Sequence, residues 1–94
     1  MKMLIDEMYD GLEDYFELEN EVKTVKKEKL REGSFTKLEK DNKVVDFASK
    51  NGLILVTQDG KAADIAKFHN VKCVHVEMSD IAKIVSEKLR LLRQ

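Results

Sequence analysis

The sequence predicts an α/β fold, with a small, mostly parallel sheet of about four strands and helices on both faces. Short aliphatic runs alternate along the chain with segments of helical periodicity. Strands separated by helices need crossover connections, and such connections favour parallel pairing. The chain has 94 residues, of which 43% are hydrophobic, so it can build one packed domain over residues 1–94.

The first forty residues are predicted to contribute two strands and one helix. Residues 2–5 form an aliphatic run that predicts a buried strand. The apolar spacing over residues 8–18 predicts an amphipathic helix, and residues 21–25 fit a second strand. Residues 26–40 lack a clear period, so we interpret them as a loop with at most one helical turn.

The middle of the chain is predicted to form a helix followed by the clearest strand. Residues 42–50 have helical spacing, and the pair Asn51 and Gly52 is typical of a helix C-terminus. Residues 53–56 are continuously aliphatic, which predicts a parallel strand covered on both faces.

The last third of the chain is predicted to form two helices around a fourth strand. We expect a helix over residues 60–68 and a strand over residues 72–76, after which Ser79 can cap a final helix. Its apolar stripe comprises Ile81, Ile84, Val85, Leu89 and Leu92. Leu91 lies off this stripe, either as a partner contact or, more simply, as a singly exposed apolar residue. A homodimer would add burial to so small a fold.

The charges are nearly balanced, with 17 basic against 18 acidic residues. This balance argues against binding of nucleic acid or anionic membranes by the whole surface. The distribution is uneven. Residues 1–21 carry eight acids and one base, a net charge of −7, whereas residues 22–94 carry ten acids and sixteen bases, a net charge of +6. A local basic surface therefore remains open as an interpretation.

The sequence contains no feature that directs the chain to a membrane or to secretion. Its longest apolar run is residues 53–56, far below the ~18 residues needed to span a bilayer. The N-terminus turns acidic at Asp6, unlike a secretory signal. The single cysteine, Cys73, cannot form an internal disulfide and is interpreted as a small buried hydrophobe. We expect a cytoplasmic protein that does not enter a membrane.

Three aspartates are expected to meet at one edge of the sheet. Asp6 follows the first strand, and Asp59 follows the clearest strand by two residues. Right-handed crossovers give a strand order such as 2-1-3-4, with the switch point between these two strands, where ligands of parallel sheets bind. Asp41 opens the helix that leads into the strand before Asp59, so it reaches the same edge. Glu7 lies beside Asp6.

Each of these carboxylates also has a plainer interpretation. An aspartate before a helix is a preferred N-cap, and Glu7 would be a favourable first-turn charge. Together, however, carboxylates about 4 Å apart repel by roughly 4 kcal/mol at an effective dielectric constant of 20. A divalent cation such as Mg²⁺ or Mn²⁺ removes this repulsion.

Neighbouring polar residues allow two interpretations. Lys43 and Lys61 could pair with the acids, which restores a structural role, or could contact phosphate. Thr57 could hydrogen-bond an acid or a metal-bound water, or could be an ordinary residue at a strand end. The basic run that includes Lys26, Lys27, Lys29 and Arg31 could follow an RNA backbone or could be a solvated loop.

Three segments resemble the PIN-like domain family of metal-dependent nucleases, which includes the toxin ribonucleases of toxin–antitoxin pairs. They are Leu4-Ile5-Asp6-Glu7, Asp41-Asn42-Lys43-Val44-Val45-Asp46-Phe47-Ala48 and Ile54-Leu55-Val56-Thr57-Gln58-Asp59. The resemblance covers residues 3–76 and is greatest to the compact branch that begins with an Asp-Glu pair. It implies a three-layer α/β/α sandwich.

The resemblance also implies a metal site. Asp6, Asp41 and Asp59 match the metal-binding acids of the family, Thr57 matches its small hydroxyl residue, and the cofactor would be Mg²⁺ or Mn²⁺. The family usually supplies another acid from a mid-chain helix. Residues 26–40 offer no clear counterpart, so Glu7 is the candidate substitute.

Three hypotheses follow. The first is a metal-dependent ribonuclease that hydrolyses phosphodiester bonds, with an antitoxin-like protein as a further partner. The second is a catalytically degenerate PIN-like module that binds protein or RNA, which the short chain and the missing mid-chain acid favour. The third is a phosphate-accepting receiver domain. The small strand number and the lack of a lysine directly after the fourth strand argue against it.

Overall fold

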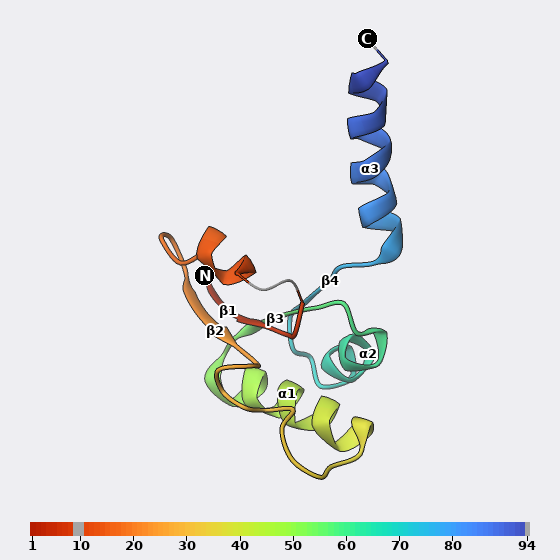
Figure 1. Ribbon diagram of the computed structural model, residues 1–94. Helices are drawn as coiled ribbons and strands as arrows, with labels where there is room; N and C mark the ends of the chain where they lie inside the picture. Colours follow the sequence, from red (N-terminus) through yellow and green to blue (C-terminus); the bar gives the residue numbers. More distant parts are fainter. Residues whose placement is uncertain (9–10, 94) are drawn as a thin grey trace.

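The computed structural model describes residues 1–8 and 11–93 and shows an α/β fold with a four-stranded parallel sheet (Figure 1). The strands are β1 (Lys2–Ile5), β2 (Glu21–Thr24), β3 (Ile54–Thr57) and β4 (Cys73–His75). Their order is β2-β1-β3-β4, which confirms the predicted order. All neighbouring pairs are parallel, and Ile5 lies opposite both Thr24 and Val56. The carboxyl ends of β1 and β3 are therefore adjacent at the centre of the sheet.

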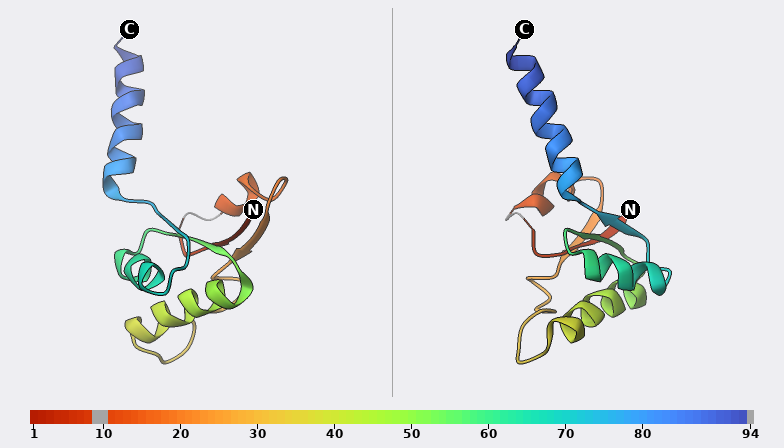
Figure 2. Two further views of the ribbon diagram at one scale, coloured as in Figure 1. Left: turned by 180° about the vertical axis from the view of Figure 1, so that it is seen from behind. Right: turned by 90° about the vertical axis from the view of Figure 1, so that its right-hand side faces the viewer.

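Two helices cover the same face of the sheet. Helix α1 (Lys37–Asn51) connects β2 to β3, and helix α2 (Gly60–Phe68) connects β3 to β4. Both crossovers move across the sheet in the same direction, so right-handedness places both helices on one face. The 3₁₀ helix η1 (Leu12–Tyr15) belongs to the crossover that moves the opposite way and lies on the other face (Figure 2).

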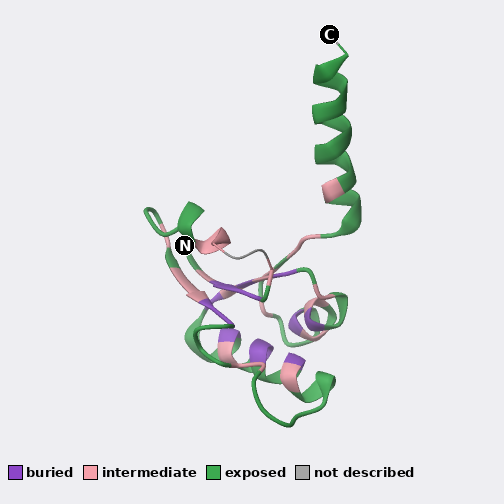
Figure 3. Cartoon of the chain, in the orientation of Figure 1, coloured by how far each residue is buried: buried purple, intermediate pink, exposed green. Residues whose placement is uncertain are grey.

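The core lies between the sheet and helices α1 and α2. Leu4 and Leu55 point from the two central strands into this layer and are fully buried. Val44 and Ala48 meet them from α1, and Ala66 meets them from α2. In the described part of the chain, neither η1 nor α3 contains a buried residue, so the buried residues lie in or next to the sheet and in the helices that cover it (Figure 3). Cys73 is only partly buried against this core.

Helix α1 begins earlier than the sequence pattern indicates. Thr36 is its N-cap, and the Thr36 hydroxyl accepts a hydrogen bond from the backbone N–H of Glu39 at 3.1 Å. Asp41 therefore lies in the second turn, and the expectation that Asp41 opens the helix is wrong. The C-terminus agrees with the prediction, because Gly52 adopts a left-handed conformation with φ of 63°.

The predicted helix over residues 8–18 is shorter in the structure. Residues 9–10 lie outside the described part of the chain, and only Leu12–Tyr15 forms a 3₁₀ helix. Gly11 precedes it with φ of 84°, which is incompatible with a continuous helix, and Glu13 would repel Glu17 across one helical turn.

The final helix, α3 (Met78–Leu92), has Glu77 rather than Ser79 as its N-cap residue. The carboxylate of Asp80 accepts the Glu77 backbone N–H at 2.8 Å, which fixes the helix start two residues before the predicted first turn. Among the described residues, no helix combines the length and hydrophobicity that a membrane crossing requires.

Candidate acidic site

The structure brings Asp6, Asp41 and Asp59 together at the carboxyl edge of the sheet. Asp6 follows β1 and is 4% exposed, whereas Asp41 is fully buried in α1. Asp59 is the N-cap of α2, where its side chain accepts the backbone N–H groups of Lys61 and Ala62. Three segments distant in sequence thus converge because parallel strands end at one edge and the helix between them begins there.

Arg31 hydrogen-bonds to two of these carboxylates, and its Nη2 lies 3.8 Å from Oδ2 of the third, Asp59. Its Nε donates to Asp6 Oδ1 at 2.9 Å, and its Nη2 donates to Asp6 Oδ2 at 2.8 Å. Its Nη1 donates to Asp41 Oδ1 at 2.6 Å. The side chain is 13% exposed, and the two carboxylates raise the pKa of the guanidinium further above its already high value. The sequence groups Arg31 with candidate RNA contacts, but in the structure its guanidinium is engaged by the acids.

Lys37 joins the other pair of carboxylates. Its Nζ donates to Asp41 Oδ2 at 3.0 Å and also to Asp59 Oδ2. These contacts raise the pKa of Lys37, with the Asp59 hydrogen bond contributing most. Partial burial acts to raise the pKa of Asp59, but Lys37 and the α2 N-terminus outweigh it and lower that pKa. A chain of alternating charges therefore runs from Asp6 through Arg31, Asp41 and Lys37 to Asp59.

Thr57 and Glu7 support Asp6 by hydrogen bonds. The buried Thr57 hydroxyl donates to Asp6 Oδ2 at 2.8 Å and accepts the backbone N–H of Asp59 at 3.0 Å. The backbone N–H of Glu7 donates to Asp6 Oδ1 at 2.8 Å, and Glu7 itself is exposed. Thr57 thus connects the ends of β1 and β3, and Glu7 acts on Asp6 through its main chain.

Burial and hydrogen bonding act in opposite directions on Asp6. Burial favours the neutral carboxyl and tends to raise its pKa. Hydrogen bonds from Arg31, Thr57 and the Glu7 backbone favour the carboxylate, and together they lower the pKa of Asp6 below its ordinary value. Asp6 is therefore held ionised in the folded protein.

The lowered pKa of Asp6 predicts a loss of stability in acid. A carboxyl with a depressed folded-state pKa contributes stability that is complete above its unfolded pKa and lost as pH falls through the folded value. We expect the free energy of unfolding to decrease below about pH 4, and to decrease less steeply in Asp6→Asn. Urea unfolding between neutral pH and acid measures this, with the exposed Glu17→Gln as control. Equal acid slopes for wild type and Asp6→Asn would contradict the assignment.

The donor chemistry of the site suits a hard cation, but its present contacts are made by protein cations. Oxygen ligands from carboxylates are those that Mg²⁺ and Mn²⁺ prefer. Both oxygens of Asp6, Asp41 and Asp59 already contact Arg31, Lys37 or backbone N–H groups. Over residues 1–8 and 11–93, no group of three ligating side chains stands ready to hold an ion. Metal binding would require Arg31 and Lys37 to give up these contacts.

The other basic residues predicted to contact nucleic acid lie around the site in different ways. Lys26, Lys27 and Lys29 line a hollow of about 750 Å³ that also contains Asp6 and Glu7. Lys43 lies over the ring of Phe35, with Nζ 3.2 Å from the ring centroid. Lys61 contributes its backbone N–H to Asp59. The cations that pair with the three aspartates are thus Arg31 and Lys37, and not Lys43 or Lys61, for which pairing with the acids was one of two interpretations.

The sequence interpretation places Lys37 in the basic segment over residues 26–40 and misses its pairing with Asp41 and Asp59. Lys37 and Asp41 are separated by four residues, a spacing that places oppositely charged side chains together on one helical turn. The signal was hidden because residues 26–40 were expected to form a loop, whereas Thr36 starts the helix. Arg31 has no comparable local signal, since it reaches Asp6 across 25 residues.

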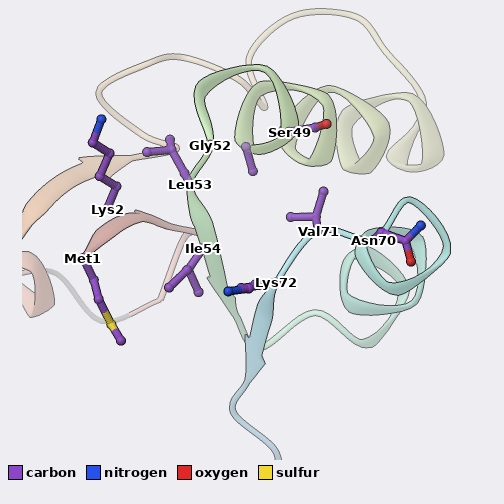
Figure 4. Close-up of a pocket in the computed structure, with 10 residues that line it drawn as sticks. Met1, Lys2, Ser49, Gly52, Leu53, Ile54, Asn70, Val71 and Lys72 are labelled. Carbon is purple, nitrogen blue, oxygen red and sulfur yellow. The ribbon is translucent and has the colours of Figure 1, made fainter.

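A second hollow lies at the opposite edge of the sheet. It has a volume of about 390 Å³ and is bordered by Lys2, Leu53, Asn70 and Lys72 (Figure 4). None of the described residues that line it carries a carboxylate, so it is separate from the acidic site. Comparison of the chain with protein-family models, curated proteins and solved structures finds no match.

Proposed function

We propose that this protein is a PIN-like, divalent-metal-dependent nuclease that hydrolyses phosphodiester bonds in RNA. The observation that carries the proposal is the convergence of Asp6, Asp41 and Asp59, from three separate segments, at the switch point of a parallel sheet. Ligands of open parallel sheets bind at this place. Three buried or half-buried carboxylates gathered there form a strongly cation-seeking group.

The residues of the site would have distinct tasks. Asp6, Asp41 and Asp59 would hold Mg²⁺ or Mn²⁺, and Glu7 would support the ion directly or through water. When bound, such an ion supplies an activated water and stabilises charge on the phosphate being cleaved. Thr57 would keep Asp6 oriented, because its hydroxyl already donates to Asp6 Oδ2.

The hollow beside Asp6 provides a place for the substrate. Lys26, Lys27 and Lys29 border it, and lysines attract the phosphates of a nucleic acid backbone. Glu13 and Glu32 also border it and would oppose binding of long stretches of backbone. This mixed charge favours a short segment of RNA. A cytoplasmic ribonuclease of this class would act with an inhibitory, antitoxin-like protein partner.

Replacing Asp59 tests the proposal with little disturbance of the fold. Asparagine is also a good N-cap, so Asp59→Asn should preserve the start of α2. Changes in groups that merely support metal ligands often cost about 10–100-fold in activity. We therefore expect Asp59→Asn to reduce Mn²⁺-dependent cleavage of single-stranded RNA by at least about 100-fold. Cleavage is measured by gel assay with and without chelator.

The matched control is Asp64→Asn, which removes an exposed carboxylate from the same helix. It should cleave RNA at the wild-type rate. Cleavage by Asp59→Asn that equals this control, with unchanged circular dichroism for both variants, would disprove the catalytic site.

A second function is favoured by the contacts of Arg31. A guanidinium that makes two hydrogen bonds to Asp6 and one to Asp41 can replace a metal ion permanently. The protein would then be a PIN-like module that binds protein or RNA without cleaving it. The two functions differ in whether Mn²⁺ can compete with Arg31 for the carboxylates.

A further inference from the structure

Helix α3 leaves most of its apolar stripe uncovered. The helix extends away from the sheet and from helices α1 and α2 (Figure 1). Six large apolar side chains on α3 are each at least 50% exposed, namely Met78, Ile84, Val85, Leu89, Leu91 and Leu92. Among the described residues of α3, only Ile81 is partly buried (Figure 3). An apolar helical face of this width is normally packed against another surface.

The overall dimensions also show that α3 is unpacked. The radius of gyration is 14.8 Å, compared with about 12 Å expected for a compact chain of 94 residues. The longest extent of the molecule is 49 Å, against 29 and 25 Å in the other directions. The excess lies along the direction in which α3 projects (Figure 2).

The sheet has an apolar surface that could receive such a helix. Successive side chains of a strand point to opposite faces. Leu4 and Leu55 face α1 and α2. The residues that alternate with them along the strands therefore line the opposite surface of the sheet, which we call the η1 face. Its apolar members are Met3, Ile5, Val22, Ile54, Val56 and Val74. Helix η1 packs near β2, and Ile5 is already buried, at 3% exposed. Ile54 and Val56 remain partly exposed and Val74 is 51% exposed, so the open part of this face lies over β3 and β4.

The charges of the two surfaces are complementary. Residues 11–21, which include η1 and border the η1 face, carry five acids and no base. Helix α3 and the residue after it carry four bases and two acids. The bases are Lys83, Lys88, Arg90 and Arg93, and the acids are Asp80 and Glu87. A basic apolar helix and an acidic apolar sheet face on the same chain favour contact with each other.

The connection to α3 directs the helix away from its own sheet. Only Val76 and Glu77 separate β4 from α3. The Val76 N–H donates to the Thr57 carbonyl at 2.9 Å, and the Glu77 N–H donates to Asp80 at 2.8 Å. These bonds fix the chain on both sides of the connection. A short connection that cannot turn the chain back prevents a helix from packing on its own sheet. It therefore favours exchange of that helix between two copies of the chain.

We propose that α3 of one copy docks on the η1 face of a second copy, and that the second copy returns the same contact. The two contacts are related by a two-fold axis, so the assembly closes as a dimer. A helix of 15 residues is about 22 Å long. The dimer contains two such contacts, so its interface buries twice the area that one helix buries. This total approaches the size of stable protein interfaces, which bury at least about 1,200 Å². This inference does not rest on the proposed nuclease activity, although Ile5 of the η1 face also borders the hollow beside Asp6.

The test is the mass of the full chain in solution, measured by light scattering after gel filtration over roughly a hundredfold dilution. We expect a dimer. Val85→Glu places a charge in the helix stripe, and Val74→Glu places one on the η1 face. Both side chains are at least 50% exposed, so the fold of each copy should persist. Each variant should weaken dimerisation by more than about tenfold.

The control is Ser86→Glu, which changes the net charge by the same amount at an exposed position away from the apolar stripe of α3 and should remain dimeric. Circular dichroism confirms that each variant is folded. A wild-type chain that stays monomeric throughout the dilution series would overturn the proposal. In that case α3 either packs on its own sheet or binds a different protein. A dimer that survives Val85→Glu would place the interface elsewhere. A dimer lost in Val85→Glu but kept in Val74→Glu would indicate pairing between two α3 helices and would also overturn it.

Discussion

Arg31→Gln is expected to destabilise the metal-free protein by about 3–5 kcal/mol, because removing one member of a buried ion pair leaves its partners uncompensated. Asp6 and Asp41 would lose three hydrogen bonds from the guanidinium. Their mutual repulsion would then be offset only by Lys37 and by the hydrogen bonds from Thr57 and the Glu7 backbone. Urea unfolding followed by circular dichroism measures the loss.

The same variant should bind Mn²⁺ more tightly than the wild type. In the proposed metal site Arg31 would compete with the ion for Asp6 and Asp41, so its removal should free carboxylate oxygens for coordination. We expect at least about a tenfold gain in Mn²⁺ affinity by titration calorimetry, which corresponds to about 1.4 kcal/mol. Saturating Mn²⁺ should then restore part of the lost stability, because a ligand that binds only the folded state stabilises it.

Arg90→Gln provides the control for this experiment. Arg90 pairs with Glu87 on the exposed surface of α3, so its loss should change stability by less than about 1 kcal/mol. If Mn²⁺ stabilises neither the wild type nor Arg31→Gln, the metal site is absent and the binding module is the better account. If Arg31→Gln is as stable as the wild type without metal, the ion pairs do not hold the site together.

Leu55→Ala is expected to lower the free energy of unfolding by about 2–5 kcal/mol, the range for large-to-small changes in packed cores. Leu55 is fully buried in the central strand β3, where it contacts the layer formed by α1 and α2. Small domains have total stabilities of about 5–15 kcal/mol, so this loss is a large share. The urea midpoint should fall strongly.

Leu18→Ala removes the same atoms from the surface, since Leu18 is 98% exposed. We expect its effect on the free energy of unfolding to stay within about 0.5 kcal/mol. A similar loss in both variants would mean that burial of Leu55 against the helices does not stabilise the fold. A loss below about 1 kcal/mol for Leu55→Ala would lead to the same conclusion.

Elements whose signals are local were predictable from the sequence. The bounds of β1 and α2 agree with the prediction, because an aliphatic run and an Asp-capped apolar period are complete within a few residues. The strand order follows from the handedness of crossovers, which also places Asp6 and Asp59 at the same edge. The sequence pattern does not reveal the start of α1. Thr36 has a Glu three residues later, which is typical of a helix N-terminus, but no apolar run follows directly behind it.

The partners of the acids were less predictable. Arg31 lies in a segment with Lys29 at φ of 56° and Gly33 at φ of 101°, conformations that no helical or strand period encodes. The path of this segment decides which cation reaches Asp6. Arg31 lies in the predicted loop over residues 26–40, and Lys43 lies just after it. Both are basic, yet Lys43 lies over the ring of Phe35 whereas Arg31 is enclosed by carboxylates.

Local patterns in the chain were sufficient to define the strands, their parallel order and the edge at which acidic side chains collect, since each depends on short-range periodicity and on the handedness of L-amino acids. Two further properties arose only when the chain was folded. They are the neutralisation of Asp6 by Arg31 and of Asp59 by Lys37, and the separation of α3 from the sheet. Each depends on contacts between residues distant in sequence, and the energy of such contacts is set by burial and geometry that no local window contains.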